Sequence, residues 1–438
     1  MCIRDRAEEA RRVAGRVMAR RDMGKLVFLD LVDRSGRLQL FCKPDELGGA
    51  VDLDLGDVVG AEGQPMKTRR GEPSLHVREL VLLAKNRKPL PDTFHGVTDV
   101  ETRYRQRYLD LLMNEETRSD FVARARVVAA IRRHLDGDGF VEVETPVLQP
   151  EYGGAFARPF ATHHNELDRE MYLRIAGGEL YLKRLIVGGL EKVYELGKVF
   201  RNEGVSYKHN PEFTMLEWYE AYADYRDTME RFERLVEAVA LEVAGSTRVT
   251  WRGHEVDLRA PWRRVRLVDA LEERGLWTRD ADELRRRLEG RGTDTQHDRT
   301  WAQLVDHALT AYVEPELVEP AFLHDYPIEL SPFARRTDDD PAIVERFEGF
   351  VAGTELCNAF SELNDAEEQE ERFAMQAEEG AGGNVEVEPG DADYVNALSY
   401  GMPPTGGLGV GIDRLAMLLT GRESIRDVIL FPALRGRA

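Results

Sequence analysis

The segment from Phe200 to Tyr219 carries an arginine, an acid, a histidine and an aromatic residue at fixed spacings. Arg201 can neutralise the α-phosphate of ATP, where negative charge grows as a carboxylate attacks it. Glu203 and His209 can hold the nucleotide, and Phe213 offers a ring face on which adenine can stack. Each residue could instead serve the fold, through a buried salt bridge or core packing. The whole set, placed on two predicted strands and their loop, indicates an ATP site.

A glycine-rich stretch, Gly406–Gly411, precedes Asp413 and Arg414 and then an apolar helical pattern. It superficially resembles a dinucleotide-binding loop, which needs a strand before it, a helix from its third glycine and an acid about twenty residues later. Here the glycines lie within an apolar strand. We interpret them, Gly411 included, as letting the backbone lie close to ATP, and Arg414 as a partner for the γ-phosphate at the start of the helix.

Two glutamates, Glu348 and Glu355, lie between these stretches and are candidates for a metal site. Mg²⁺ prefers oxygen ligands, few protein carboxylates and the phosphates of a substrate. In a β-strand the two side chains would point to opposite faces, so a turn at Gly353 must realign them. Acidic surface clusters are common, and the prediction depends on the motifs that flank the pair.

Composition limits the class of protein. With 438 residues and 42% hydrophobic content, the chain can bury a full core in about two or three domains. No run of about 18 apolar residues and no apolar leader is found, so we expect a cytoplasmic protein without a membrane segment. The cysteines, Cys2, Cys42 and Cys357, are scattered, which supports neither disulfides nor zinc. Any metal must then be held by oxygen.

The net charge of −20 is unevenly distributed, with +3 in residues 1–110 and −23 in the remainder. A basic N-terminal module that binds nucleic acid on an acidic enzyme body would produce this asymmetry. An acidic remainder that only keeps the protein in solution would produce it equally well.

Residues 13–83 read as about five short strands. Val27–Val32 leads through a turn at Asp33–Gly36 into Leu38–Phe41, which is a hairpin pattern, and β-like stretches follow at Asp57–Glu62 and Ser74–Leu83. Such a pattern favours a small closed barrel of the OB-fold type, whose face often binds single-stranded nucleic acid. Many small barrels have no such partner.

A basic, proline-rich linker is expected after the barrel, and Arg103–Tyr108 alternates cations with aromatic residues. That run could grip RNA or form an ordinary surface helix. The large domain is expected to begin with a helix capped by Ser119 and ending at Gly137, in which Val122, Ala125, Val128, Ala129, Ile131 and Leu135 have helical spacing. A strand over Phe140–Thr145 then stops at a proline.

This helix–strand–proline unit, the Phe200–Tyr219 segment and the Gly406–Leu419 segment resemble the three signature motifs of class II aminoacyl-tRNA synthetases. Over nearly its whole length the chain resembles the bacterial class II lysyl-tRNA synthetases. Further stretches that carry the resemblance are Arg158–Asn165, Met171–Ala176, Glu179–Leu185, Phe360–Asp365 and Arg426–Pro432. The resemblance implies an α+β fold: an OB-fold anticodon-binding domain (1–84), a linker (85–118) and a catalytic domain (119–438) with an antiparallel sheet flanked by helices. It also implies a homodimer, with the first motif at the dimer interface.

The resemblance assigns roles to individual residues. Glu348 and Glu355 are implied to bind Mg²⁺, and in the barrel Arg21, Phe28 and Gln39 match positions that read anticodon bases. The implied lysine pocket consists of Gly154, Glu179, Glu217, Tyr219, Asn358, Phe360 and Glu362.

Such a pocket makes physical sense for lysine, because an ε-ammonium that loses water needs carboxylates and a hydroxyl in exchange. Glu217, Glu362 and Tyr219 can provide them, while Glu179 or the backbone near Gly154 can hold the α-ammonium. Related enzymes for aspartate or asparagine would need cations or amides at these positions.

The implied reaction needs no covalent enzyme intermediate. The carboxylate of lysine attacks the α-phosphorus of ATP, pyrophosphate leaves, and a terminal ribose hydroxyl of tRNA(Lys), by resemblance the 3′-hydroxyl, attacks the lysyl adenylate. Arg201 and Arg414 are the residues expected to stabilise the charge on the phosphates.

Two other classes compete with this interpretation. A paralogue that attaches an amino acid to a protein would have no use for an anticodon barrel, and residues 13–83 argue against it. A regulatory RNA-binding protein with an inactive synthetase domain would lose Arg201, Arg414 or the paired glutamates, and all are present.

Three features depart from the family pattern. Met1–Arg6 does not look like the natural start of such a chain, so truncation is expected. Gly177-Gly178 stands where relatives have one residue, which makes the position of Glu179 less certain. Glu378–Asp393 is rich in glycine and acids and is expected to be a mobile loop.

Overall fold

The computed structural model describes residues 9–91, 96–154, 157–331, 333–381 and 390–436. Cys2, the segment Met1–Arg6 and residues 382–389 of the expected loop lie outside these ranges. The chain forms two compact units, Met1–Glu115 and Glu116–Ala438. None of the described helices is long and apolar enough to cross a membrane.

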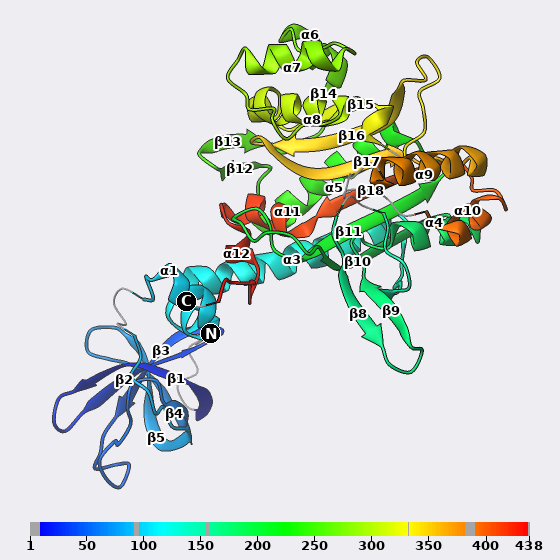
Figure 1. Cartoon of the computed structure of the whole chain (residues 1–438). Helices are drawn as coiled ribbons and strands as arrows, with labels where there is room; N and C mark the ends of the chain where they lie inside the picture. The colour runs from blue at the N-terminus through cyan, green and yellow to red at the C-terminus, as the bar shows by residue number, and fades with distance from the viewer. Residues whose placement is uncertain (1–8, 92–95, 155–156, 332, 382–389, 437–438) are drawn as a thin grey trace. The chain divides into compact units, whose positions relative to one another are not determined.

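The first unit contains a closed five-stranded barrel in the order β1-β2-β3-β5-β4 (Figure 1). The predicted hairpin is confirmed, because β2 and β3 pair from Val27–Cys42 down to Asp33–Gly36. Alternate residues point inward, and Leu29, Leu40 and Val77 are fully buried in the barrel core. The strands are β1 (Arg11–Asp22), β2 (Val27–Asp33), β3 (Gly36–Cys42), β4 (Val58–Lys67) and β5 (Pro73–Ala84).

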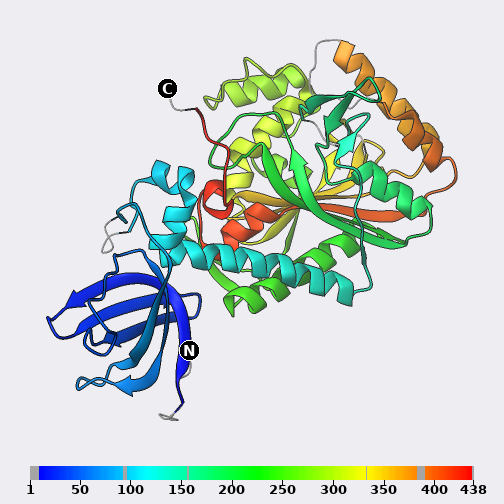
Figure 2. The same cartoon turned by 90° about the horizontal axis from the view of Figure 1, so that it is seen from below.

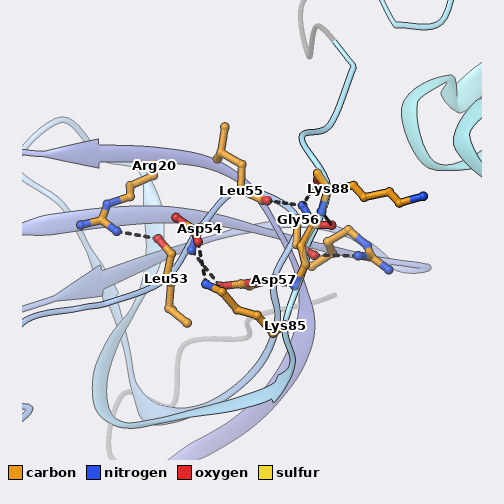
Figure 3. Close-up of polar contacts among 10 residues, drawn as sticks. Arg20, Leu53, Asp54, Leu55, Gly56, Asp57, Lys85 and Lys88 are labelled. Atoms are coloured by element: carbon orange, nitrogen blue, oxygen red, sulfur yellow. Dashed lines mark hydrogen bonds and ion pairs between the residues drawn. The ribbon is translucent and has the colours of Figure 1, made fainter.

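A buried carboxylate joins the loop before β4 to the chain that leaves the barrel after β5. Asp57 accepts hydrogen bonds from the backbone N–H of Asp54 (2.8 Å) and Asn86 (2.7 Å) and from Lys85 Nζ (2.9 Å). Figure 3 shows Lys85 reaching the carboxylates of both Asp54 and Asp57, and Arg20 of β1 donating to the carbonyl of Leu53. The Asp57 carboxylate therefore ties two separate segments of the first unit together.

Replacing Asp57 with Ala leaves the backbone N–H groups of Asp54 and Asn86 without this acceptor and leaves Lys85 with Asp54 alone, and we expect the barrel to lose about 2 kcal/mol of unfolding free energy. Burial raises the pKa of Asp57, but hydrogen bonds from Asp54, Lys85 and Asn86 outweigh it and leave the pKa below its usual value. The stabilisation is therefore present at neutral pH and is lost as the pH falls below about 4. Hydrogen exchange of the barrel amides would report the loss. Asp52→Ala, at an exposed position in the same loop, is the matched control, and equal effects of both variants would contradict the prediction.

Two short helices, α1 (Val100–Arg105) and α2 (Arg107–Met113), follow the barrel in the same unit. Arg107 is fully buried and forms an ion pair with Asp110, which also pairs with Arg103 at 3.0 Å. Tyr108 is 63% exposed. The surface-helix interpretation of this run is therefore wrong for Arg107, whose guanidinium is buried 5.3 Å from the centre of the Tyr104 ring of α1, while the Arg103–Asp110 ion pair joins the two helices.

The second unit is built on an eight-stranded sheet in the order β14-β15-β16-β17-β18-β11-β10-β6 (Figure 1). It is antiparallel except for the pairs β14–β15 and β10–β6. A small sheet, β7-β9-β8, and a hairpin, β12–β13, are separate from it. The strands are β6 (Val141–Glu142), β7 (Leu148–Gln149), β8 (Phe160–His164), β9 (Arg169–Leu173), β10 (Lys192–Phe200), β11 (Glu212–Ala221), β12 (Arg248–Trp251), β13 (His254–Asp257), β14 (Arg263–Arg266), β15 (Ala321–Pro327), β16 (Ile343–Val351), β17 (Thr354–Ser361) and β18 (Thr405–Gly411).

Helices pack on both faces of this sheet. Residues of α3, α5 and α11 form the largest apolar core against one face, and Figure 2 shows α3 and α5 side by side along it, where Arg126 donates to the carbonyl of Glu242. The helices are α3 (Glu115–Gly137), α4 (Glu179–Val187), α5 (Tyr225–Ala244), α6 (Leu267–Glu273), α7 (Ala281–Glu289), α8 (Trp301–Tyr312), α9 (Ala366–Ala381), α10 (Ala392–Leu398), α11 (Ile412–Thr420) and α12 (Ile425–Val428), with 3₁₀ turns at Glu314–Glu316 and Ile328–Leu330.

The first helix of the second unit differs from the prediction. α3 begins at Glu115, so Ser119 lies inside it and is not its cap. Val122 is 60% exposed, whereas Val127 and Ala130 are buried. Apolar residues occur on both faces of this helix, and only packing decides which face is covered. The strand expected over Phe140–Thr145 is limited to Val141–Glu142.

The alternation of side chains in β11 separates core from site. Leu216 and Trp218 are fully buried and pack in the core with α3 and α5. Glu217 and Tyr219 therefore point to the opposite face of the sheet. The side chains predicted to do chemistry lie on that face.

Candidate active site

A cavity of about 380 Å³ opens on this face, between β11, β17 and β18 and the segments that flank them. Glu348 is the one predicted site residue of this unit that does not line it. The predicted residues that do are Gly154, Glu179, Arg201, Glu203, His209, Phe213, Glu217, Tyr219, Glu355, Asn358, Phe360, Glu362, Gly411 and Arg414. Residues chosen from separate motifs thus share one cavity.

A hairpin and a β-bulge place the residues of β16 and β17 on the same face. Val351 pairs with Thr354 across a two-residue turn at Ala352-Gly353, and Phe350 then pairs with Glu355. The turn expected at Gly353 is therefore present, and it directs Glu355 to the face of Glu348. An extra residue, Leu356, shifts the register so that Glu348 pairs with Asn358. Without that bulge, Asn358 would point into the core.

The nucleotide end of the cavity contains a half-buried cation, Arg201. Arg201 donates to the carbonyl of Ile175 (3.2 Å), and its guanidinium lies 5.3 Å from the centre of the Phe213 ring. It forms no ion pair within the described residues. Burial lowers the pKa of Arg201, partly offset by the charge of Glu203. A half-buried guanidinium with spare donors is suited to receive an anion.

His209 lies at the same end, where its Nδ1 is 3.0 Å from the hydroxyl of Ser206. Burial, and then the charge of Arg414, lower the pKa of His209. The ring is therefore neutral at pH 7 and can both donate and accept a hydrogen bond.

The two candidate metal ligands are each held by an arginine. Arg414 lies 2.9 Å from Glu355 Oε2, and Arg346 lies 2.6 Å from Glu348 Oε1. Tyr326 also donates to Glu348 Oε2 at 2.9 Å. Within the described residues, no group of three or more His, Cys, Asp or Glu side chains could hold a metal. Two carboxylates alone suit a cation that takes its remaining ligands from phosphates and water.

The other end of the cavity is rich in carboxylates. Glu217 accepts a hydrogen bond from the backbone N–H of Gly177 (2.6 Å) through Oε1. Its Oε2, and Oε1 of Glu362, are buried and have no hydrogen-bond donor in the described part of the chain. Burial, followed by the charge of Glu179, raises the pKa of Glu217 to about 8, and burial also raises that of Glu362. Orphan carboxylate oxygens of this kind need a cationic donor.

The Gly177-Gly178 pair lies next to these carboxylates, and its surroundings leave no room for a side chain at Gly178. Gly178 has φ of +102°, and a Cβ there would lie 2.5 Å from Thr145 Oγ1 and 2.9 Å from Glu195 Oε2. Glu195 in turn pairs with the buried Arg174. A side chain is therefore excluded at Gly178 both by its backbone conformation and by lack of space.

The role of the glycines in β18 is only partly as expected. A Cβ at Gly407 would lie 2.0 Å from Glu362 Oε1 and 2.5 Å from the Tyr219 ring. Gly407 therefore makes room for side chains at the carboxylate end, not for the nucleotide. Gly411 does line the cavity beside Arg414.

Several residues of the site were not predicted. Arg346 bonds to Asn358 Oδ1 (3.1 Å) as well as to Glu348. Lys183 is fully buried between Glu179 and Glu362, with Nζ 2.6 Å from each carboxylate. The only sequence signal was the apolar setting of Lys183 in α4, four residues after Glu179.

A further unpredicted residue, Asp413, joins the three signature segments. Its carboxylate accepts from the backbone N–H of Thr214 in β11 (2.7 Å) and from Arg124 of α3 (2.6 Å). Because Asp413 lies in the first turn of α11, it fixes the direction in which Arg414 leaves that helix.

On the barrel, the predicted residues occupy neighbouring rows of one face. Arg21, Phe28, Phe41 and His76 pair in turn across β1, β2, β3 and β5, so their side chains share a face. Ring centres are 5.5 Å apart for Phe28–Phe41 and 5.3 Å for Phe41–His76. Gln39 lies in the next row and accepts from Ser74 Oγ (2.9 Å). Phe41 and His76, not predicted, extend the aromatic surface.

Comparison with known proteins agrees with both units. Residues 99–435 match the family model of class II tRNA synthetases (D, K and N), and residues 12–83 match that of the OB-fold nucleic acid binding domain. The chain is 51% identical to a lysine–tRNA ligase of Dehalococcoides mccartyi, over 98% of this chain and 88% of the relative. The lysine–tRNA ligases of Syntrophomonas wolfei and Moorella thermoacetica are 50% and 51% identical, each over 97% of this chain and 88% of the relative. The chain is thus a member of the lysine–tRNA ligase family of class II aminoacyl-tRNA synthetases.

Proposed function

We propose that the protein activates L-lysine with ATP to form lysyl adenylate and transfers the lysyl group to the 3′-terminal ribose hydroxyl of tRNA(Lys), releasing AMP and pyrophosphate. The observation that carries the proposal is the pair of buried, donor-free oxygens, Glu217 Oε2 and Glu362 Oε1, in the cavity that also contains Arg201. Ammonium groups of an amino acid would satisfy these oxygens. In place of the side-chain ammonium of lysine, aspartate would bring a carboxylate that these oxygens repel, and asparagine a neutral amide that cannot balance their charge.

At the nucleotide end, Arg201 is the group placed to neutralise the α-phosphate. Charge on the phosphate oxygens grows as the carboxylate of lysine attacks, and a preorganised guanidinium stabilises it without reorganisation. Glu203, His209 and Phe213 hold the nucleotide, with the ring of Phe213 as the stacking face for adenine. Arg414 exchanges its contact with Glu355 for the γ-phosphate and holds the departing pyrophosphate.

Glu348 and Glu355 would hold Mg²⁺, because their oxygens share one face of the bulged hairpin and suit a hard cation. When bound, Mg²⁺ would supply positive charge to the phosphates of ATP. Arg346 and Arg414 neutralise the two carboxylates until the substrate arrives.

At the amino-acid end, Glu217, Glu362 and Tyr219 receive the ε-ammonium, and Glu179 and the backbone near Gly154 receive the α-ammonium. Asn358 and Phe360, which lie on the same face of β17, complete the pocket. No protein side chain is needed as a general base for transfer to tRNA.

The barrel is proposed to read the anticodon. Phe28, with Phe41 and His76 beside it, offers ring faces on which unpaired bases can stack, and Arg21 and Gln39 offer hydrogen bonds to base edges. We divide the chain into the anticodon-binding domain (1–84), a linker (85–118) and the catalytic domain (119–438).

We further propose a homodimer that works in the cytoplasm, where tRNA is charged. Exposed apolar side chains on the first signature segment support self-association, since Val122 is 60%, Val141 51% and Leu148 39% exposed.

ATP–pyrophosphate exchange with each amino acid in turn tests the proposal. We expect exchange with lysine and little with aspartate or asparagine, because a site built for a side-chain ammonium rejects amino acids that lack it by about 10⁴-fold or more. No exchange with lysine, or faster exchange with aspartate, would overturn it.

A further inference from the structure

Lys183 is a buried cation behind the amino-acid end of the cavity, and the proposed reaction gives it no role. It lies on α4 one turn after Glu179, is fully buried, and does not line the cavity itself. Its Nζ is 2.6 Å from Glu179 Oε1 and 2.6 Å from Glu362 Oε2. The ammonium also lies 4.9 Å from the centre of the Phe333 ring. Lys183 is therefore held on three sides.

Each carboxylate that pairs with Lys183 keeps its second oxygen for the cavity. Oε1 of Glu362 has no donor within the described residues. Oε2 of Glu179 points toward Gly154, because a Cβ placed on Gly154 would lie 3.2 Å from that oxygen. Gly407 leaves the corresponding space beside Glu362 Oε1. One cation thus fixes two carboxylates in an orientation that presents one oxygen of each.

The charges of the pocket also balance when L-lysine is bound, provided that Lys183 contributes its positive charge. Glu179, Glu217 and Glu362 line the cavity with up to three negative charges, and Lys183 reduces the total to two. L-lysine brings two ammonium groups. Burial lowers the pKa of Lys183, but the charges of Glu179 and Glu362 outweigh it and keep the pKa well above its usual value. The side chain therefore remains charged.

We propose that Lys183 is a positioning residue for amino-acid selection, which orients Glu179 and Glu362 so that the pocket fits two ammonium groups at the spacing found in lysine. This inference rests on the proposed lysine pocket. Removing the ammonium lets Glu362 turn toward the cavity and reach a shorter side chain. Discrimination between lysine and ornithine, which differ by one methylene, then falls.

The test is ATP–pyrophosphate exchange by the full-length protein and its Lys183→Met variant, with lysine and with ornithine. For K183M we expect the KM for lysine to rise about tenfold or more, the KM for ATP to stay within about twofold, and the ornithine-to-lysine ratio of kcat/KM to rise about fivefold or more. Arg184→Met, the next residue on α4, which pairs with Asp391, is the matched control and should change none of these.

A second variant covers the case in which K183M does not fold. Lys183→Met combined with Glu179→Gln removes both charges of one ion pair, which is usually better tolerated than removing one. It should still show the raised ornithine-to-lysine ratio of kcat/KM. An unchanged ratio in whichever variant folds, or equal changes in the KM for lysine and ATP, would overturn the inference. Absence of lysine exchange in the unmodified protein would instead overturn the proposed function.

Discussion

Arg201→Ala should lower kcat/KM for ATP–pyrophosphate exchange by about 10³-fold or more, equivalent to about 4 kcal/mol of transition-state stabilisation. The half-buried guanidinium lies against the Phe213 ring and forms no ion pair within the described residues, so its charge is available to the α-phosphate. The loss should appear mainly in kcat, because the charge grows only as the carboxylate attacks.

Two controls accompany this variant. Arg234→Ala, at an exposed ion pair on α5, makes the same substitution away from the cavity and should leave exchange unchanged. Phe28→Ala, on the barrel face, should leave exchange unchanged but weaken charging of tRNA. If Arg201→Ala and Phe28→Ala reduced exchange equally, the proposed division between catalytic and anticodon-binding domains would be wrong.

Glu217→Gln should lower kcat/KM for lysine by about 10²-fold or more, with the KM for ATP nearly unchanged. The change preserves the shape of the side chain, and the amide oxygen can still accept from the N–H of Gly177. It removes the negative charge that a buried ammonium requires. Glu220→Gln on the same strand, where the carboxylate pairs with Arg231 and Lys192, is the matched control.

The pH dependence of lysine binding gives an independent check of the same residue. Because burial and the charge of Glu179 raise the pKa of Glu217 to about 8, the empty enzyme carries a proton there at pH 7. An ammonium ion favours the ionised form, so binding releases the proton. Glu362 faces the same ammonium, and burial raises its pKa as well. The apparent affinity should therefore rise by up to about tenfold per pH unit for each of these two carboxylates that releases a proton, until the pH passes their pKa values, and then level off. Calorimetry in buffers of different ionisation enthalpy would count the protons, and an equal count in Glu217→Gln would contradict the assignment.

The parts of the fold that the sequence predicted are those with local signals. The β2–β3 hairpin has alternating apolar residues and a turn at Asp33–Gly36, and the structure pairs those strands. The start of α3 had a misleading signal, because Ser119 looks like a cap but lies inside the helix. Arg107 looked like a surface cation, and its burial depends on Asp110 and on packing that no short pattern records.

The candidate site divides in a similar way. Arg201, Glu217 and Arg414 were found because each belongs to a compact motif. Lys183 and Arg346 were missed because each role depends on a second partner that only the fold brings close, Glu362 for Lys183 and Asn358 for Arg346. The bulge at Leu356 could not be predicted either, since the residues before and after it look like one uninterrupted strand.

That bulge has a consequence for how the gene can vary. A point substitution at Leu356 changes one side chain of the core. Deletion of a single codon there would instead turn every later side chain of β17 to the opposite face of the sheet. Asn358 and Phe360 would turn into the apolar core, and Cys357 and Ala359 would face the substrates. The length of this strand is therefore under stricter constraint than the identity of most residues in it, and insertions or deletions should be tolerated in the surrounding loops but not here.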